Sequence, residues 1–277
     1  MNLLLLESSE IGTDHVATVN GVRARHLRLV LRATIGRPVR IGIVDGPMGN
    51  GTVLTLDDER ATLQCVFEAA PPAIPEVDLL LAVPRPKVLQ RLWAQIAALG
   101  VGRIILTNAE RVERNYFDTH VLDPATYRPL LIEGLQQARD TRVPLVSIHR
   151  QFRVLVEDEL DHLCPQPTRL RADPEPYVPA GASPSQVATP LAPHQPPHLL
   201  PAAPVAPAIP DASARILMAV GPEGGWNDFE RRLLESRGFR RVSLGPRALR
   251  SDTACIALLT LATAGVWTGK QLPAEPA

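Results

Sequence analysis

Two glycine-bearing segments late in the chain combine residue types that could form a ligand site. The first, VGPEGGW (220–226), follows the apolar run 214–219 and precedes a helical pattern. A phosphate-binding loop needs GxxxxGK[ST], and a dinucleotide fingerprint needs GxGxxG, but neither spacing is present here. Glu223 would also place a carboxylate beside the phosphates. The sequence therefore argues against a nucleoside polyphosphate as the ligand of this turn.

Glycines at the carboxyl end of a strand still allow a ligand to approach the backbone closely. An acidic residue beside them suits a cationic or hydroxyl-bearing ligand. S-adenosylmethionine (SAM) fits this description, because it carries a sulfonium, an ammonium group and ribose hydroxyls. We therefore expect Gly221 and Gly225 to hold such a ligand through close backbone approach.

The second segment, LGPRALRSDTA (244–254), reads as a strand end, a glycine turn and the start of a helix. Arg247 and Arg250 stand three residues apart in it, and Ser251 and Asp252 are predicted as helix caps. A guanidinium can stabilise negative charge on a substrate oxygen. The two segments thus predict two adjacent loops at the carboxyl ends of two strands, one with an acid and one with two cations.

Composition limits the class of protein. The 277 residues have zero net charge and 45% hydrophobic content, typical of a soluble globular chain of one large or two ordinary domains. No apolar run approaches the roughly 20 residues that span a bilayer. The three cysteines are widely spaced, which predicts reduced thiols and no metal site. Residues 21–40 and 237–250 each hold several arginines and no acid. These arginines either bind phosphate or are simply solvated charges.

The pattern of elements changes along the chain. Residues 1–70 read as short strands with tight turns, including a turn at 46–51, which suits a small barrel. A proline-rich break at 69–77 precedes alternating strands and helices, which predict an α/β domain with a largely parallel sheet. Residues 174–210 contain twelve prolines and read as a flexible insertion. The expected strands are 77–83, 101–107, 143–149, 214–221 and 239–245, and the expected helices are 86–100, 125–139, 227–238 and 251–267.

The two segments together resemble the RsmE family, the ribosomal RNA uridine-N3 methyltransferases of the SPOUT superfamily. Their pattern is approximately GPEGG-[FW]-x3-E followed by LG-x-R-[IV]-LR-x-ET-A, and matching positions here are Glu230, Arg247, Leu249, Arg250, Thr253 and Ala254. Weaker matches occur at 25–46, 85–101, 133–144 and 171–176. The chain departs from the family pattern at Asp252 (usually Glu), Ala248 (usually Ile or Val), Gln95 (usually Lys) and Ala98 (usually Glu).

The resemblance implies an N-terminal PUA-like RNA-binding β-barrel, residues 1–70, followed by a SPOUT α/β methyltransferase domain, residues 75–277, with a C-terminal trefoil knot. It implies a cytoplasmic homodimer that uses SAM, requires no metal or membrane, and acts on 16S rRNA of the small ribosomal subunit. By this analogy the SAM cradle comprises Val220, Gly221, Gly225, Leu244, Gly245 and Leu249. The N-terminal arginines expected to meet RNA are Arg23, Arg25, Arg28 and Arg32.

Methylation at N3 of uridine requires loss of an imide proton and stabilisation of the resulting anion. Arg250 is the first candidate for that stabilisation and Arg247 the second. Glu223 is the candidate proton acceptor, alongside water and Asp252, for which a helix-capping role is favoured. Two other functions stay open from sequence alone. One is a non-catalytic RNA-binding protein with the same fold, and the other is a methyltransferase that acts on a different RNA, such as a tRNA.

Overall fold

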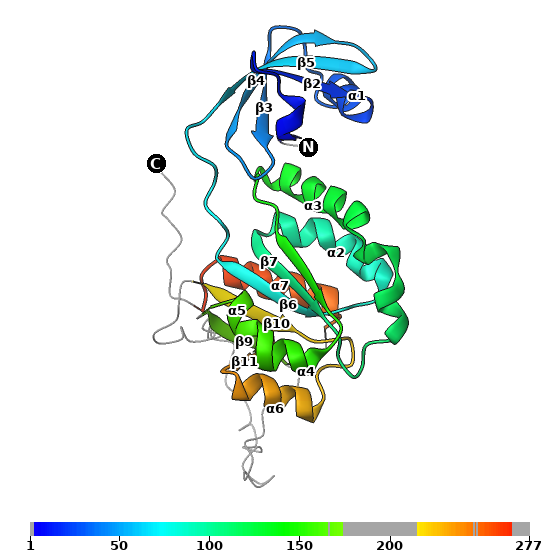
Figure 1. Cartoon of the computed structure of the whole chain (residues 1–277), viewed down its shortest axis with the longest axis vertical. Coiled ribbons are helices and arrows are strands. Elements are labelled where there is room, and N and C mark those ends of the chain that lie inside the picture. The colour runs from blue at the N-terminus through cyan, green and yellow to red at the C-terminus, as the bar shows by residue number, and fades with distance from the viewer. Residues whose placement is uncertain (1–2, 166, 174–214, 246, 248, 268–277) are drawn as a thin grey trace, which may run out of the picture.

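The computed structural model describes residues 3–165, 167–173, 215–245, 247 and 249–267, which form two sheets with their helices (Figure 1). The N-terminal sheet is followed by a larger α/β layer, and within the described residues the chain passes from one to the other through the proline-rich segment 69–76. The predicted insertion at 174–210 lies outside the described residues.

The N-terminal sheet is mixed and has the strand order β1-β3-β4-β5-β2. β1 runs parallel to β3, and the other pairs are antiparallel. Buried and exposed residues alternate along β4 and β5, so one face of each strand packs inward. The strands are β1 (Leu4–Leu6), β2 (Val16–Asn20), β3 (Pro38–Ile43), β4 (Met48–Leu56) and β5 (Arg60–Phe67).

Two sequence-based expectations for this region were wrong. A helix, α1 (Val22–Leu29), interrupts the expected run of strands. It buries only Ala24 and Leu27, which is too short an apolar stripe to stand out in a sequence. The expected turn at 46–51 is also shifted, because β4 already begins at Met48. The chain instead reverses over 44–47, where the amide of Ile43 donates to the carbonyl of Pro47 at 3.0 Å.

The C-terminal sheet is entirely parallel, with the order β11-β9-β10-β6-β7-β8. β6 and β10 lie in its middle, and every residue in both strands is buried. The alternation of strands and helices therefore predicted this sheet correctly, although β9 was not recognised as a full strand. The strands are β6 (Val77–Ala82), β7 (Val101–Thr107), β8 (Leu145–His149), β9 (Thr168–Ala172), β10 (Ile216–Val220) and β11 (Arg240–Val242).

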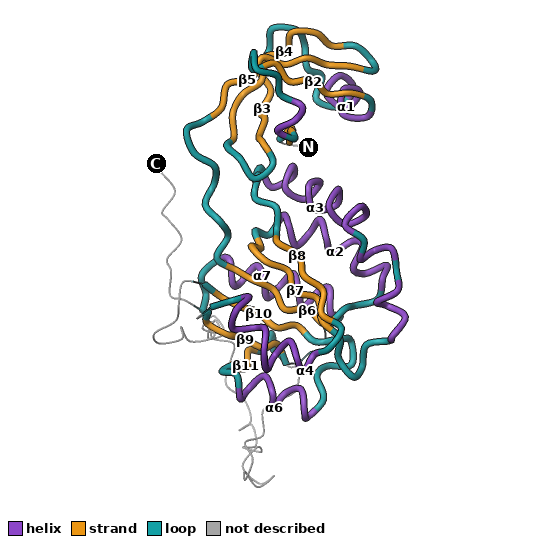
Figure 2. The backbone as a smooth tube through the Cα atoms, in the orientation of Figure 1, coloured by secondary structure: helices purple, strands orange, loops and turns teal. Residues whose placement is uncertain are grey.

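Helices cover both faces of the parallel sheet (Figure 2). On one face lie α2 (Pro86–Ala98) and α7 (Ser251–Thr263), with α3 (Pro124–Ala138) packed on α2. Gly134 allows this approach, since a Cβ there would stand 2.0 Å from the carbonyl oxygen of Ala94. On the other face lie α4 (Phe152–Val154), the π turn Leu155–Glu159, α5 (Leu160–Leu163) and α6 (Asp228–Ser236). Short 3-10 turns occupy Ser8–Glu10, Arg114–Asp118 and His120–Leu122.

Polar contacts join the two sheets near the end of α3. The hydroxyl of Thr141 donates to the carbonyl of Gly46 at 2.6 Å, and the amide of Val143 donates to Asp45 Oδ1 at 2.9 Å. An exposed ion pair links Arg128 to Glu7 at 2.7 Å. The N-terminal sheet is therefore fixed to the loop that precedes β8. Among the described residues, no helix is long and apolar enough to cross a membrane.

Candidate functional site

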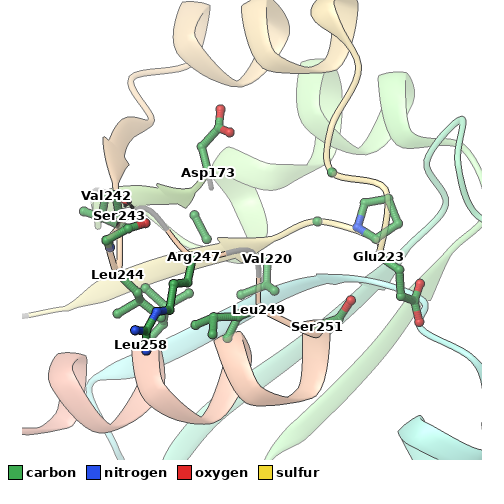
Figure 3. A pocket seen from close by; sticks show the side chains of 16 residues that line it. Asp173, Val220, Glu223, Val242, Ser243, Leu244, Arg247, Leu249, Ser251 and Leu258 are labelled. Atoms are coloured by element: carbon green, nitrogen blue, oxygen red, sulfur yellow. Dashed lines mark hydrogen bonds between the residues drawn. The ribbon is translucent and has the colours of Figure 1, made fainter. Parts of the chain in front are cut away.

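A pocket opens at the carboxyl edge of the parallel sheet, where β9, β10 and β11 end and α7 begins (Figure 3). This is the edge at which ligands bind in open α/β sheets. The loops after β10 and β11 supply most of its wall, so the two glycine-bearing segments meet there. The lining residues are Ala172, Asp173, Val220, Gly221, Pro222, Glu223, Gly225, Val242, Ser243, Leu244, Gly245, Arg247, Leu249, Ser251, Ala254 and Leu258.

The structure brings the sequence-predicted site residues together. All six residues expected to cradle the cofactor line this one pocket: Val220, Gly221, Gly225, Leu244, Gly245 and Leu249. Arg247 and Glu223 line it as well, at opposite ends in Figure 3. Arg250 lies outside this pocket and lines an adjoining hollow, which Glu223 also borders.

The local backbone geometry and packing of the two turns also favour glycine, independently of any role in ligand binding. Gly225 has φ +73° and Gly245 has φ +102°, a region that side chains with a Cβ rarely adopt. A Cβ on Gly221 would stand 3.0–3.2 Å from the indole of Trp226. Gly221 therefore lets Trp226 pack under the loop, where that side chain is 2% exposed. The sequence predicts glycine here because a ligand approaches the backbone closely, and the geometry of the turns is a second reason for glycine.

The loop after β10 is held by charged side chains from elsewhere in the chain. Arg111 donates to the carbonyl of Gly224. Buried Glu230 accepts from the amide of Asn227 at 2.8 Å and from the amide of Glu110 at 2.7 Å. The first of these bonds belongs to a capping box at the start of α6. Glu230, which matches the family motif, thus fixes the exit of the loop and does not line the pocket.

The start of α7 differs from the expectation that Ser251 and Asp252 cap the helix. The N-cap residue is Arg250, and no side chain caps the helix there. Asp252 accepts instead from the amide of Thr253 at 2.9 Å and pairs with Arg91 at 3.5 Å. Ser251 is 5% exposed, and its Oγ has no hydrogen-bond partner among the described residues. A buried hydroxyl without a partner is costly, so this atom is suited to meet a ligand.

Sequence reasoning missed three residues at this edge. Asp173 is 9% exposed, follows β9 and lies 3.6 Å from the guanidinium of Arg171. Its only sequence signal was the strand-end resemblance at 171–176. The sequence predicts a capping role for Ser251, and it holds no signal that singles out Arg85, at the N-cap of α2. Within the described residues no group of three potential metal ligands occurs.

The N-terminal arginines expected to bind RNA lie on or near α1, and three of the four contact acids in turns that connect strands of the N-terminal sheet. Arg23 pairs with Glu10 at 2.6 Å and also donates to the carbonyl of Leu5 at 2.5 Å, so it braces the sheet. The other two pairs are exposed: Arg25 with Glu59 and Arg28 with Asp58. Arg32 is exposed, with φ +49°.

Comparison with known proteins places this architecture in a family. The profile of the family described as "RNA methyltransferase domain" matches residues 71–263. The chain therefore belongs to the RNA methyltransferase domain family, and the resemblance to RsmE drawn from the two motifs is confirmed.

Individual relatives extend over almost the whole chain. It is 29% identical over 279 residues to "Ribosomal RNA small subunit methyltransferase E" of Treponema pallidum, which covers 98% of this chain and 94% of that protein. A similar fold occurs in the crystal structure of a protein of the same name from Neisseria gonorrhoeae, bound to S-adenosyl methionine. Its TM-score is 0.67 at 20% identity, with 96% of this chain and 98% of the other covered. The structure of a putative methyltransferase from Legionella pneumophila, in complex with SAM, matches with a TM-score of 0.66 at 18% identity. The match covers 95% of this chain and 97% of the other.

Proposed function

We propose that this protein is a SAM-dependent methyltransferase that methylates N3 of a uridine in 16S rRNA of the small ribosomal subunit. The observation that carries the proposal is the single pocket that gathers all six predicted cofactor residues at the carboxyl edge of the sheet. The relatives support the same activity, because they carry the name of a small-subunit ribosomal RNA methyltransferase or were solved with SAM.

The chemistry of the pocket suits SAM. Leu244, Leu249 and Leu258 offer apolar surface for an adenine ring, and the glycine turns present main-chain groups to a ligand. The partnerless hydroxyl of Ser251 is available to a polar group, and the carboxylate of Glu223 suits a cation. When bound, SAM supplies the methyl group as an electrophile. The side chains of the protein must then orient the base and accept the imide proton.

We assign the first catalytic role to Arg250, the stabilisation of negative charge on the uracil. Support comes from its position outside the cofactor pocket but beside it, in a hollow that shares Glu223 and Ser251 with that pocket. Glu223 is the proposed proton acceptor. Arg247 lines the cofactor pocket at the end away from Glu223, which favours a role at the cofactor over one at the base.

The finer features of the fold belong to the same proposal. Residues 1–70 would form a PUA-like RNA-binding barrel and 75–277 a SPOUT domain with a trefoil knot, acting as a cytoplasmic homodimer. Arg25, Arg28 and Arg32 are exposed, and phosphate would displace the exposed acids that pair with Arg25 and Arg28, whereas Arg23 would act by holding α1 in place.

Titration calorimetry with SAM separates this proposal from a non-catalytic RNA-binding function. We expect the wild-type protein to bind SAM, and Arg250→Ala to bind it within about twofold while methyl transfer to small subunits falls by ~100-fold or more. Arg232→Ala, on the exposed side of α6, is the control and should change neither quantity. Absence of SAM binding by the wild-type protein would favour the non-catalytic function, and equal losses of binding and turnover would make Arg250 a brace of the pocket.

A further inference from the structure

A hollow adjoins the cofactor pocket between the end of β6 and the start of α7. Its lining residues are Arg85, Val88, Glu223, Arg250, Ser251 and Asp252. Glu223 and Ser251 line both cavities, and Figure 3 shows them at the same end of the pocket. The buried, partnerless hydroxyl of Ser251 therefore lies at the junction of the two. A ligand in the hollow would reach a second ligand in the pocket across this junction.

Two arginines, Arg85 and Arg250, line the hollow. The side chain of Arg250 is exposed and makes no ion pair or hydrogen bond with the residues that the structure describes. Arg85 is also exposed, and its guanidinium lies near the phenol of Tyr116. Burial and Glu113 raise the pKa of Tyr116, and Arg85 acts in the opposite direction. A guanidinium has five N–H donors, so a contact with the phenol leaves most of the Arg85 donors available.

The two acids of the hollow are not equivalent. Asp252 is engaged by Arg91 at 3.5 Å and by the amide of Thr253 at 2.9 Å. Glu223 Oε1 accepts from the backbone amide of Arg85 at 3.4 Å, which holds the carboxylate at the N-terminus of α2. No contact within the described part of the chain uses Glu223 Oε2. Glu223 is therefore the carboxylate that remains able to accept a proton or a hydrogen bond from a ligand.

The hollow thus offers two cationic donors and one anionic acceptor, and this set complements one edge of one base. The Watson–Crick edge of uracil presents a carbonyl oxygen, the N3–H donor and a second carbonyl oxygen. On cytosine the same edge presents an amino donor, an acceptor nitrogen and a carbonyl oxygen, which would set an acceptor against Glu223 and a donor against a guanidinium. Mismatches between buried polar groups discriminate strongly between substrates.

We propose that Arg85 and Arg250 each donate to one carbonyl oxygen of the target uracil while Glu223 accepts the N3 proton, so that Arg85 helps to determine specificity for an imide base. This inference rests on the proposed function. In the step, the N3–H bond breaks, the proton moves to the Glu223 carboxylate, and the electron pair stays on N3. The resulting charge spreads onto both carbonyl oxygens, where the two guanidinium groups stabilise it. The base must be unpaired or flipped out to present this edge.

The test compares Arg85→Ala and Arg85→Lys with the wild-type protein, using small ribosomal subunits from a strain that lacks the gene. Lys87→Ala is the matched control, since Lys87 is an exposed cation two residues away that does not line the hollow. We expect Arg85→Ala to lower kcat/KM by ~30- to 100-fold with SAM affinity within about twofold, as for a lost charge-assisted hydrogen bond. Arg85→Lys should recover part of the loss, and Lys87→Ala should stay within about threefold.

The dependence of the methylation rate on pH shows whether Arg85 stabilises the uracil anion or only supports the structure of the site. A cation beside the uracil favours the ionised imide, so its removal should raise the apparent pKa of the rate profile by about one unit, and the deficit should shrink as pH rises. An unchanged profile or a matching loss of SAM affinity would overturn the proposal, with thermal melting used to confirm that each variant is folded. If the wild-type protein transfers no methyl group, the proposed function itself fails. If the wild-type and Arg85→Ala proteins are equally active, the proposed function stands and only the inference about Arg85 fails.

Discussion

The hydroxyl of Ser251 provides a test in which stability and binding should move in opposite directions. The side chain is 5% exposed at the start of α7, and its Oγ has no partner among the described residues. Leaving such a group buried costs about 1–3 kcal/mol. Ser251→Ala removes the hydroxyl and leaves the backbone of α7 in place, so the ligand-free protein should become more stable by about 1 kcal/mol. For a domain of this size that corresponds to a rise in Tm of about 2–4 °C.

The same substitution should weaken binding if the hydroxyl meets a ligand. A lost neutral hydrogen bond of about 0.5–1.5 kcal/mol corresponds to a fall of ~3- to 10-fold in affinity for SAM or for the RNA substrate. Differential scanning calorimetry without ligand and titration calorimetry with ligand measure the two effects. Thr260→Ala, on the exposed side of the same helix, controls for helix propensity. A loss of stability together with unchanged affinities would show that the hydroxyl is already satisfied within the protein and meets no ligand.

Three further predictions address the supports of the site. Gly225→Ala places a Cβ at φ +73°, which should cost about 1–2 kcal/mol in thermal unfolding and also lower SAM affinity; unchanged values would mean that the turn relaxes freely. Glu230→Ala leaves the two backbone amides that it now satisfies without partners, and urea titration should show a loss of about 2–4 kcal/mol; a loss below 0.5 kcal/mol would contradict the bracing role. Burial raises the pKa of Cys164 and Cys255 to about 12, and Cys65 is buried as well, so iodoacetamide at pH 8 should label none of them until the protein is unfolded; rapid labelling of the native protein would contradict their burial.

The parallel sheet and the site at its edge could be predicted because their signals are local. β10 is a continuous apolar run, β6 is apolar except for Asp78, and glycine turns follow the ends of β10 and β11. Since parallel strands end at one edge, the loops that follow them meet without further information. The departures from the family pattern at Gln95 and Ala98 also lie in a correctly predicted helix, where Gln95 is exposed and Ala98 partly buried.

The features that sequence reasoning missed depend on packing across the fold. Helix α1 buries only two residues, so its short stripe looks like part of a β region. Ser251 has the residue type of a cap, and its burial follows from how α7 docks against the sheet, which no local pattern encodes. Arg85 precedes β10 by more than 100 residues and reaches Glu223 only because β6 and β10 are neighbours. The ion pairs of Arg23, Arg25 and Arg28 likewise join helix α1 to turns that are distant from it in the sequence.

The most direct test of the proposed function is nucleoside mass spectrometry after incubation of the purified protein with SAM and small ribosomal subunits from a strain that lacks the gene. We expect N3-methyluridine to appear in 16S rRNA, approaching one per subunit, with none formed by Arg250→Ala on the same time scale. Methylation of a different nucleoside, or no methyl transfer by a folded protein that binds SAM, would contradict the proposed function.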